Sequence, residues 1–274
     1  MRRGIIRLRA LGRNLFLLSL AVAALAAACS RRTGAGELIV AGSTSIQPFA
    51  DRWAEAYMAR HPGRPVSVQG GGSSAGIRAA RSGTAQIGTS SRDLKPDEKD
   101  LKEIVVARDG LAVIVHPRNP LGGLTLEQAR HIFLGEIRNW IHIGGREGPI
   151  TVVTREEGSG TRGAFQELVM GKLRIAKGAI VEDSNGTVRE IVAGDPNAIG
   201  YISLGLVDDR VKALALDEVP ASEENILAGR YKLVRPFLFV TNGEPGREAG
   251  PFIDFVLSPE GQKMIQLEGL IPAR

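Results

Sequence analysis

The chain of 274 residues contains one cysteine and only four histidines. A single cysteine excludes a disulfide within the chain, and with it the small folds that depend on several disulfides. The histidines have no obvious acidic partner in sequence, and no group of residues shows the spacing of metal ligands. They are His61, His116, His131 and His142. The sequence therefore gives no indication of a metal centre.

The first 28 residues have the pattern of an export signal. Residues 1–13 carry five arginines and no acid, and residues 15–28 are almost wholly apolar. This apolar stretch is shorter than the ~20 residues that span a bilayer, and a basic head, an apolar middle and small residues at the end are typical of a signal peptide. Cys29 follows three alanines directly, which resembles a bacterial lipoprotein signal, although the usual leucine stands one position early at Leu25. We expect a signal peptide over residues 1–28, lipidation of Cys29 and a tether over residues 29–36; the alternative is cleavage elsewhere among the alanines, which leaves a free thiol.

The same segment explains the charge of the chain. The formal net charge of +5 comes from 35 Lys and Arg against 30 Asp and Glu. Removal of residues 1–28 takes away five arginines and no acids, and leaves 30 against 30. A balanced chain argues against nucleic acid and against a polybasic membrane patch as partners. Any affinity for anions must therefore be local.

From Glu37 onward, short β-branched runs alternate with apolar patterns of helical period, which indicates the α/β class. Four of the predicted strands lead directly into loops that are rich in Gly, Ser and Thr. Ligands of open α/β sheets bind outside the carboxyl ends of the strands, so we expect these loops to meet at one site. The loops are residues 42–45, 70–76, 89–92 and 155–161.

The fourth loop, with Arg155 at its start, has the composition of an oxyanion site. Its glycines allow a close backbone approach, and the first N–H groups of the following helix have no partner within the helix. Ser159 and Thr161 add hydroxyl donors, and Arg155 adds a planar charged fork. The alternative is an ordinary capped helix beside a solvated arginine. In the first loop, Ser45 is expected to cap the next helix, since Pro48 must fall in its first turn.

Together these segments resemble the phosphate-binding proteins of bacterial phosphate ABC transporters. The resemblance covers roughly residues 37–270 and rests on AGSTSIQP (41–48), QGGGSSAG (69–76), IGTSSR (87–92), REEGSGT (155–161), IFLGEIRNW (132–140) and AIGYIS (198–203). It implies a type II periplasmic-binding-protein fold with a ligand cleft between two lobes and two crossing segments. Lobe one would comprise residues 37–112 plus 218–274, and lobe two residues 113–217.

The resemblance also implies a function and a set of site residues. The function is extracytoplasmic binding of inorganic phosphate and its delivery to permease subunits of an ABC transporter. Glu157 would pair with Arg155, as an acid two residues after the arginine does in the family. Some relatives have aspartate where this chain has Ser91, which puts the discrimination against sulfate in doubt. The implied ligand-binding residues are Thr44, Ser45, Ser73, Ser91, Arg155, Ser159, Gly160 and Thr161.

The resemblance further implies a monomer that is not an enzyme and needs no cofactor or metal, held to the membrane only by its lipid, in the periplasm or on the outer face of the cell. One alternative is binding of another tetrahedral oxyanion, such as sulfate. A second is a phosphatase or serine hydrolase on the same scaffold, but a nucleophile elbow needs glycine at Glu157. A third is an adhesion or signalling lipoprotein that binds no ligand.

Overall fold

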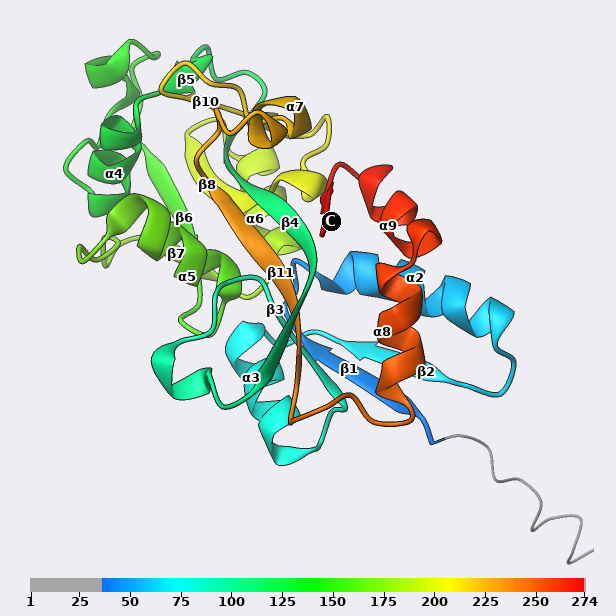
Figure 1. The fold of residues 1–274 in the computed structure, drawn as a ribbon. Coiled ribbons are helices and arrows are strands. Elements are labelled where there is room, and N and C mark those ends of the chain that lie inside the picture. Colours follow the sequence, from blue (N-terminus) through cyan, green and yellow to red (C-terminus); the bar gives the residue numbers. More distant parts are fainter. Residues whose placement is uncertain (1–35, 274) are drawn as a thin grey trace, which may run out of the picture. The chain divides into compact units, whose positions relative to one another are not determined.

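The computed structural model describes residues 36–273. The predicted signal peptide, Cys29 and the tether up to residue 35 lie outside the described residues. Eight strands follow one another across a curled mixed sheet in the order β2-β1-β3-β11-β4-β8-β6-β7 (Figure 1). Their bounds are β1 Leu38–Gly42, β2 Val66–Gln69, β3 Ile87–Ser90, β4 Lys102–Val115, β6 Thr151–Arg155, β7 Ile180–Glu182, β8 Ala198–Ser203 and β11 Val234–Thr241.

Helices and short strands complete the fold. The helices are α2 Gln47–Arg60, α3 Ser73–Ser82, α4 Leu126–Leu134, α5 Gly160–Phe165, α6 Asn185–Gly194, α7 Glu223–Leu227, α8 Ala249–Leu257 and α9 Pro259–Gln266. A π turn, Gln166–Met170, continues α5, and 3-10 turns cover Pro96–Glu98, Trp140–Ile143 and Leu204–Leu206. The short strands are β5 Gly123–Leu124, β9 Lys212–Ala213, β10 Ala215–Leu216 and β12 Ile271–Pro272.

Two long strands, β4 and β11, connect the two lobes. From Lys102 to Gly110, β4 pairs with β11, and from Leu111 to Val115 it pairs with β8. One strand therefore serves the sheets of both lobes, and β11 returns antiparallel beside it. In lobe one, β1 is parallel to β2 and β3; in lobe two, β6 is parallel to β7 and β8. The observed architecture is the two-lobed fold with two crossing segments that the family resemblance implies.

Alternation along the strands shows that helices cover both faces of the sheet. In β11, Phe237 and Phe239 pack into the core beneath α2 and α8, whereas Leu238 and Val240 pack on the opposite side with Ile77 of α3. Successive strand side chains point to opposite faces, and a sheet with helices on both faces buries both sets. This explains why the crossing strands read as nearly continuous apolar runs.

The core clusters alter one detail of the predicted lobes. The expected lobe one includes residues 218–233, yet Ile226, Tyr231 and Leu233 pack in the same apolar cluster as Phe133 of lobe two. The chain returns to lobe one only where β11 begins, at Val234. This packing favours a second boundary near residue 233 instead of residue 217, while β4 changes partner close to the expected first boundary, at Gly110 and Leu111.

The start of α2 also differs from the expectation. Its N-cap is Ile46, and no side chain caps the helix. The chain makes a turn over residues 44–46 before the helix begins, and Ile46 and Gln47 donate their N–H groups to the carbonyl of Ser43. The hydroxyl of Ser45 is therefore not used as a helix cap and is available for other contacts.

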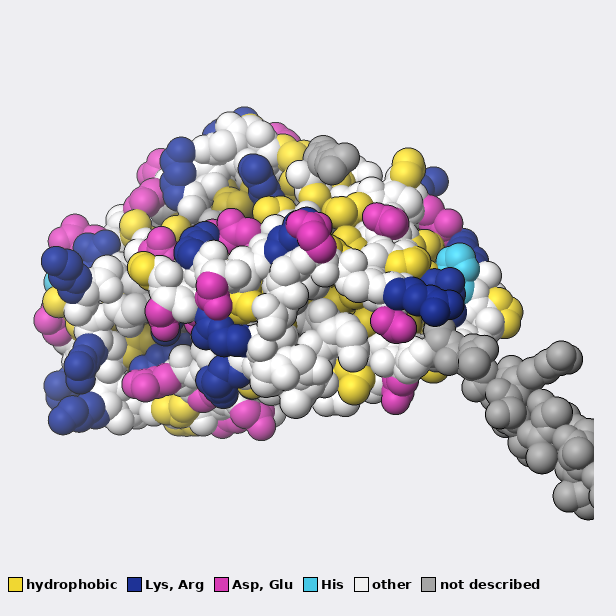
Figure 2. All heavy atoms as spheres, turned by 60° about the horizontal axis from the view of Figure 1, so that its bottom comes forward, with side chains coloured by type: hydrophobic (Ala, Val, Ile, Leu, Met, Phe, Trp, Pro, Cys, Tyr) yellow, Lys and Arg dark blue, Asp and Glu magenta, His cyan; other side chains and the backbone are white. Residues whose placement is uncertain are grey.

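On the face shown in Figure 2, basic and acidic side chains of the described residues are interspersed, in keeping with the balanced charge.

Candidate anion-binding site

The carboxyl ends of four strands converge where the two lobes meet, and every predicted ligand-binding residue lies there. Ser45 Oγ and Thr161 Oγ1, which come from different lobes, are 2.7 Å apart. Arg155 Nη2 donates to Thr44 Oγ1 at 3.3 Å, again across the lobes. Ser73 Oγ lies 3.5 Å from Ser91 Oγ and accepts the N–H of Ser91. The loops thus meet as expected: β1, β2 and β3 end at one edge of the sheet of lobe one, and the end of β6, which runs in the opposite direction, faces that edge from lobe two.

Gly160, the first residue of α5, allows the lobes to touch. A Cβ atom at this position would lie 2.1 Å from Ser73 Oγ and 2.5 Å from Ser91 Oγ. Two residues earlier, the carbonyl of Gly158 accepts the N–H of Ser74 at 3.1 Å. Only glycine permits this approach of α5 to the hydroxyls of lobe one. Ser159 caps α5 by accepting the N–H of Arg162, so its own proton is still available for donation.

Arg155 is held in place by backbone oxygens and one carboxylate. Its side chain is 1% exposed, and Nε and Nη2 donate to the carbonyls of Glu182 and Asp183 at 3.1 and 2.7 Å. Both nitrogens also donate to the carboxylate of Glu156 at 3.1 Å. Burial lowers the pKa of Arg155, and the Glu156 carboxylate opposes this shift. The guanidinium is therefore a fixed, desolvated cation at the edge of the site.

The predicted partner of Arg155 is wrong by one residue. Glu157 has a side chain that is 93% exposed, and its carboxylate lies 4.0 Å from Arg162. The N–H of Glu156 donates to the carbonyl of Glu182, which keeps Glu156 alongside β7, and the chain turns away at Glu157. Desolvation raises the pKa of Glu156, and the charge of Arg155 counteracts this rise. Glu156 therefore restrains the guanidinium.

Several buried polar residues at the site were not predicted. Ser43 Oγ donates to Ser91 Oγ at 2.9 Å, and Asn185 Nδ2 donates to Ser45 Oγ at the same distance. In the sequence, Asn185 has only the pattern of a residue at the start of a helix. A clearer signal was available in the crossing strands, where Asp109 and Arg235 each interrupt an apolar run. A charged side chain buried in an apolar strand is costly unless an opposite charge lies beside it, so these two residues are expected to pair.

Asp109 and Arg235 form an ion pair directly between the crossing strands. They are opposite residues in the register of β4 and β11, and their side chains are 0% and 1% exposed. Nε and Nη2 of Arg235 donate to Asp109 Oδ2 at 2.9 and 2.8 Å. Burial raises the pKa of Asp109, and Arg235 counteracts this shift. Arg155 and Arg235 are thus each matched by an acid, so the site has little net charge from these pairs, and hydroxyl and backbone donors act beside Arg155 in binding an anion.

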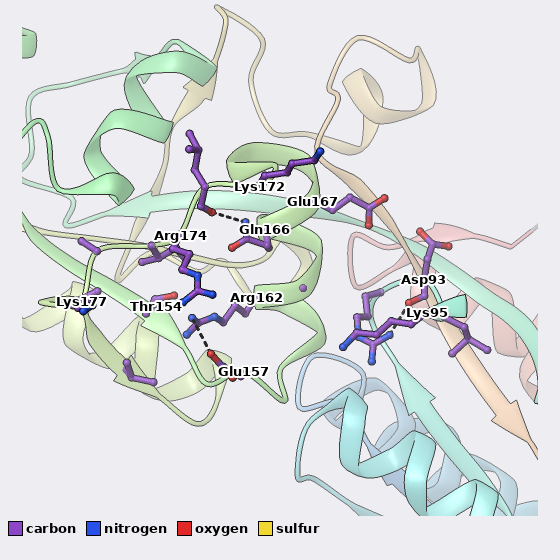
Figure 3. Close-up of a pocket in the computed structure, with 18 of the residues that line it drawn as sticks. Asp93, Lys95, Thr154, Glu157, Arg162, Gln166, Glu167, Lys172, Arg174 and Lys177 are labelled. Carbon is purple, nitrogen blue, oxygen red and sulfur yellow. Dashed lines mark hydrogen bonds and ion pairs between the residues drawn. The ribbon is translucent and has the colours of Figure 1, made fainter. Parts of the chain in front are cut away.

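A basic pocket of about 950 Å³ lies beside the site, between α5 and the loop after β3 (Figure 3). Gly163 of α5 and Arg92 of the loop pack closely where they line the pocket, since a Cβ atom on Gly163 would lie 2.7 Å from Arg92 Cδ. Its charged lining residues are the cations Arg92, Lys95, Arg162, Lys172, Arg174 and Lys177, and the acids Asp93, Glu157 and Glu167. Glu98 neutralises Arg92 at 2.7 Å, so five cations face three acids. The pocket has a modest positive excess one helical turn from Gly160.

Within residues 36–273, no helix combines the length and apolar character needed to cross a bilayer. Within the same range, no cluster of three or more His, Cys, Asp and Glu side chains has the arrangement of a metal site.

Two lobes joined by two crossing strands, with hydroxyls and helix starts converging between them, define a substrate-binding protein of the periplasmic-binding-protein class. The family described as "PBP superfamily domain" matches residues 27–260. A phosphate ABC transporter substrate-binding protein of Clostridium perfringens, solved with bound phosphate, is 43% identical and superposes with a TM-score of 0.84, covering 87% of this chain and all of its own.

Two other relatives agree. An ABC-type phosphate transport receptor of Vibrio cholerae is 38% identical, with a TM-score of 0.72 and coverage of 85% of this chain and 99% of its own. The phosphate-binding protein PstS of Bacillus subtilis is 36% identical over 245 residues, which cover 86% of this chain and 81% of that protein. The chain belongs to the PstS family of phosphate-binding proteins.

Proposed function

We propose that this protein binds inorganic phosphate between its lobes, outside the cytoplasm, and delivers it to the permease of an ABC transporter. The observation that carries the proposal is the convergence of the eight predicted residues, from both lobes, around Gly160. Hydrogen bonds to a charged group contribute ~1.5–3 kcal/mol each. Micromolar affinity needs only about −8 kcal/mol, so a few of these donors suffice. Because the anion contacts both lobes, it stabilises the closed arrangement, which the permease can recognise.

The test is isothermal titration of the purified protein with phosphate. A single site per chain with micromolar or tighter affinity is expected. The proposal would be refuted if phosphate produced neither a heat of binding nor a shift in melting temperature.

We expect weak discrimination between phosphate and sulfate, because the site presents mainly donors. Hydrogen phosphate carries a proton that needs an acceptor, whereas sulfate carries none. Ser91, where some relatives have a carboxylate, is fully buried and accepts from Ser43. Of the acids considered as substitutes, Glu157 and Asp93 are exposed, and Glu156 is engaged with Arg155.

Titration with each anion measures this preference. The expected Kd for sulfate lies within about a thousandfold of that for phosphate. A larger ratio would contradict the expectation. In that case, a Glu156→Gln variant would show whether Glu156 accepts the phosphate proton, since it should lose the preference while retaining sulfate binding.

The hydrolase alternative is not favoured by the position of Ser159. Its Oγ accepts the N–H of Arg162 as a helix cap, and none of the four histidines is among the site residues described above. Nucleophilic catalysis requires a base within hydrogen-bond reach of the nucleophile. We therefore expect no turnover of a chromogenic phosphate or acyl ester. Steady hydrolysis that is lost in Ser159→Ala would favour the enzyme instead.

The remaining parts of the proposal are a lipid on Cys29 that anchors the protein to the membrane, and a monomeric state. Relatives are substrate-binding proteins of phosphate ABC transporters, which supports an extracytoplasmic position. Mass spectrometry of the mature protein would reveal a diacylglycerol-modified Cys29. An unmodified N-terminus elsewhere in the alanine run would support the alternative cleavage.

The basic pocket predicts that phosphate association is faster at low salt. Its excess positive charge attracts anions toward the start of α5 at Gly160, and salt screens this attraction over about 10 Å at 0.1 M. Replacing Lys172, Arg174 and Lys177 by Gln is expected to reduce the association rate about threefold at low ionic strength. The dissociation rate should stay the same in stopped-flow measurements.

The control for this prediction is a second triple variant with Gln at three exposed cations away from the pocket, Arg118, Lys232 and Lys263. It removes the same charge. If both triple variants slow association equally, net charge rather than the pocket is responsible.

A further inference from the structure

The hydroxyl of Ser45 has an unusually complete set of partners. Ser45 is 1% exposed. Its Oγ receives a hydrogen bond from Asn185 Nδ2 at 2.9 Å and another from Arg235 Nη2 at 3.2 Å. Its third neighbour is Thr161 Oγ1 at 2.7 Å. A hydroxyl has two lone pairs and one proton, and here two nitrogen donors occupy both lone pairs.

The orientation of each nitrogen donor is fixed by its other contacts. Asn185 Oδ1 accepts the backbone N–H of Ser203 at 3.2 Å. A backbone N–H can only donate, so the amide oxygen must face Ser203 and the NH₂ group must face Ser45. The guanidinium of Arg235 has no acceptor atom at all. Neither partner can therefore receive the proton of Ser45.

The supports of these donors lie at the junction of the lobes. Arg235 is fixed by Asp109 on the neighbouring crossing strand and also donates Nη1 to the carbonyl of Ser91. Asp109 in turn accepts from Ser203 Oγ at 2.8 Å, at the end of β8. Asn185 is the first residue of α6 in lobe two, whereas Ser45 belongs to lobe one. The Asn185–Ser45 bond thus forms across the lobes.

We propose that Asn185 and Arg235 are positioning residues that make Ser45 an obligatory donor to the bound anion. This inference rests on the proposed function. With both lone pairs occupied, the single proton of Ser45 can go only to Thr161 Oγ1, as in this structure, or to a ligand oxygen that takes the place of Thr161. Ser45 then favours a ligand oxygen that carries no proton. Because Asn185 reaches Ser45 only when the lobes meet, this orientation is linked to closure.

The test is a double-mutant cycle with inorganic phosphate, using Ser45→Ala, Asn185→Asp and their combination. The aspartate keeps an acceptor for the N–H of Ser203 but presents an acceptor to Ser45, so the serine proton turns away from the anion. Repulsion between the new charge and phosphate acts in both backgrounds, and only the orientation effect needs Ser45. We expect Asn185→Asp to weaken binding at least threefold more in the wild-type background than in Ser45→Ala.

Equal losses in the two backgrounds would overturn the inference, while phosphate binding by the wild type would leave the proposed function intact. A wild type that does not bind phosphate would overturn both. Melting curves without phosphate check that the variants fold. If the aspartate variant does not fold, the same cycle is measured with Asn185→Leu, which carries no charge. A change at Arg235 is unsuitable, since it would leave Asp109 buried without its partner.

Discussion

The Arg155→Ala variant should bind phosphate at least ~30-fold more weakly than the wild type. The guanidinium is buried and donates across the lobes to Thr44. Its removal takes away a fixed cation and leaves Glu156, with its raised pKa, facing the site without a counter-charge. Loss of one member of a desolvated charge pair costs at least ~2 kcal/mol. Isothermal titration of both proteins measures the difference directly.

Two controls accompany this measurement. Arg155→Lys keeps the charge but not the planar fork, so an intermediate affinity is expected. Arg118→Ala removes an exposed arginine outside the site and should leave the Kd unchanged. If Arg155→Ala binds as tightly as the wild type and melts at the same temperature, the arginine has no role in the site.

Replacing Gly160 by alanine is expected to weaken binding by between about tenfold and 100-fold. The added methyl group would meet Ser73 Oγ at 2.1 Å and the Cβ of the same serine at 3.0 Å. Rotation of the hydroxyl cannot relieve the second contact, so α5 must move away from lobe one. Overpacking of this kind costs about 1–3 kcal/mol, and here the cost falls on the closed state that holds the ligand.

The same loop provides a matched control. At Gly158, two residues away, an added Cβ would have no atom within 4 Å. Gly158→Ala should therefore bind phosphate as the wild type does. The two variants are compared by titration, and by small-angle scattering with and without phosphate. A Gly160→Ala protein that compacts on adding phosphate as fully as the wild type would show that the contact does not control closure.

The agreement between sequence and structure is greatest where the determining pattern is local. A β-branched run that ends in Gly, Ser and Thr and continues into a helical period specifies a strand, a loop and a helix start within about twenty residues. For this reason each of the four loops directly follows a strand, with Ser73 at the first turn of α3 and Thr161 at that of α5. Ser45 lies beside Thr161 of the other lobe, whereas its expected role as a helix cap was wrong.

The errors and omissions arise where contacts are distant in sequence or depend on a single backbone turn. Arg235 meets Asp109 across 126 residues, and Asn185 meets Ser45 across 140. No periodicity within one segment encodes such pairs. The acid that restrains Arg155 depends on where the chain turns after the end of β6, which places Glu156 beside the guanidinium and Glu157 in solvent.

The sequence by itself determined the α/β class and the four loops, because short-range backbone preferences are written within each segment. The eight residues expected to bind the anion came from the resemblance to phosphate-binding proteins. Only the tertiary structure decided which acid holds Arg155, where the chain returns to lobe one, and that a buried ion pair supports Ser45. The last two features depend on how β4 and β11 cross between the lobes. That crossing brings residues more than a hundred positions apart to within hydrogen-bond distance, where burial makes each charge require a particular partner.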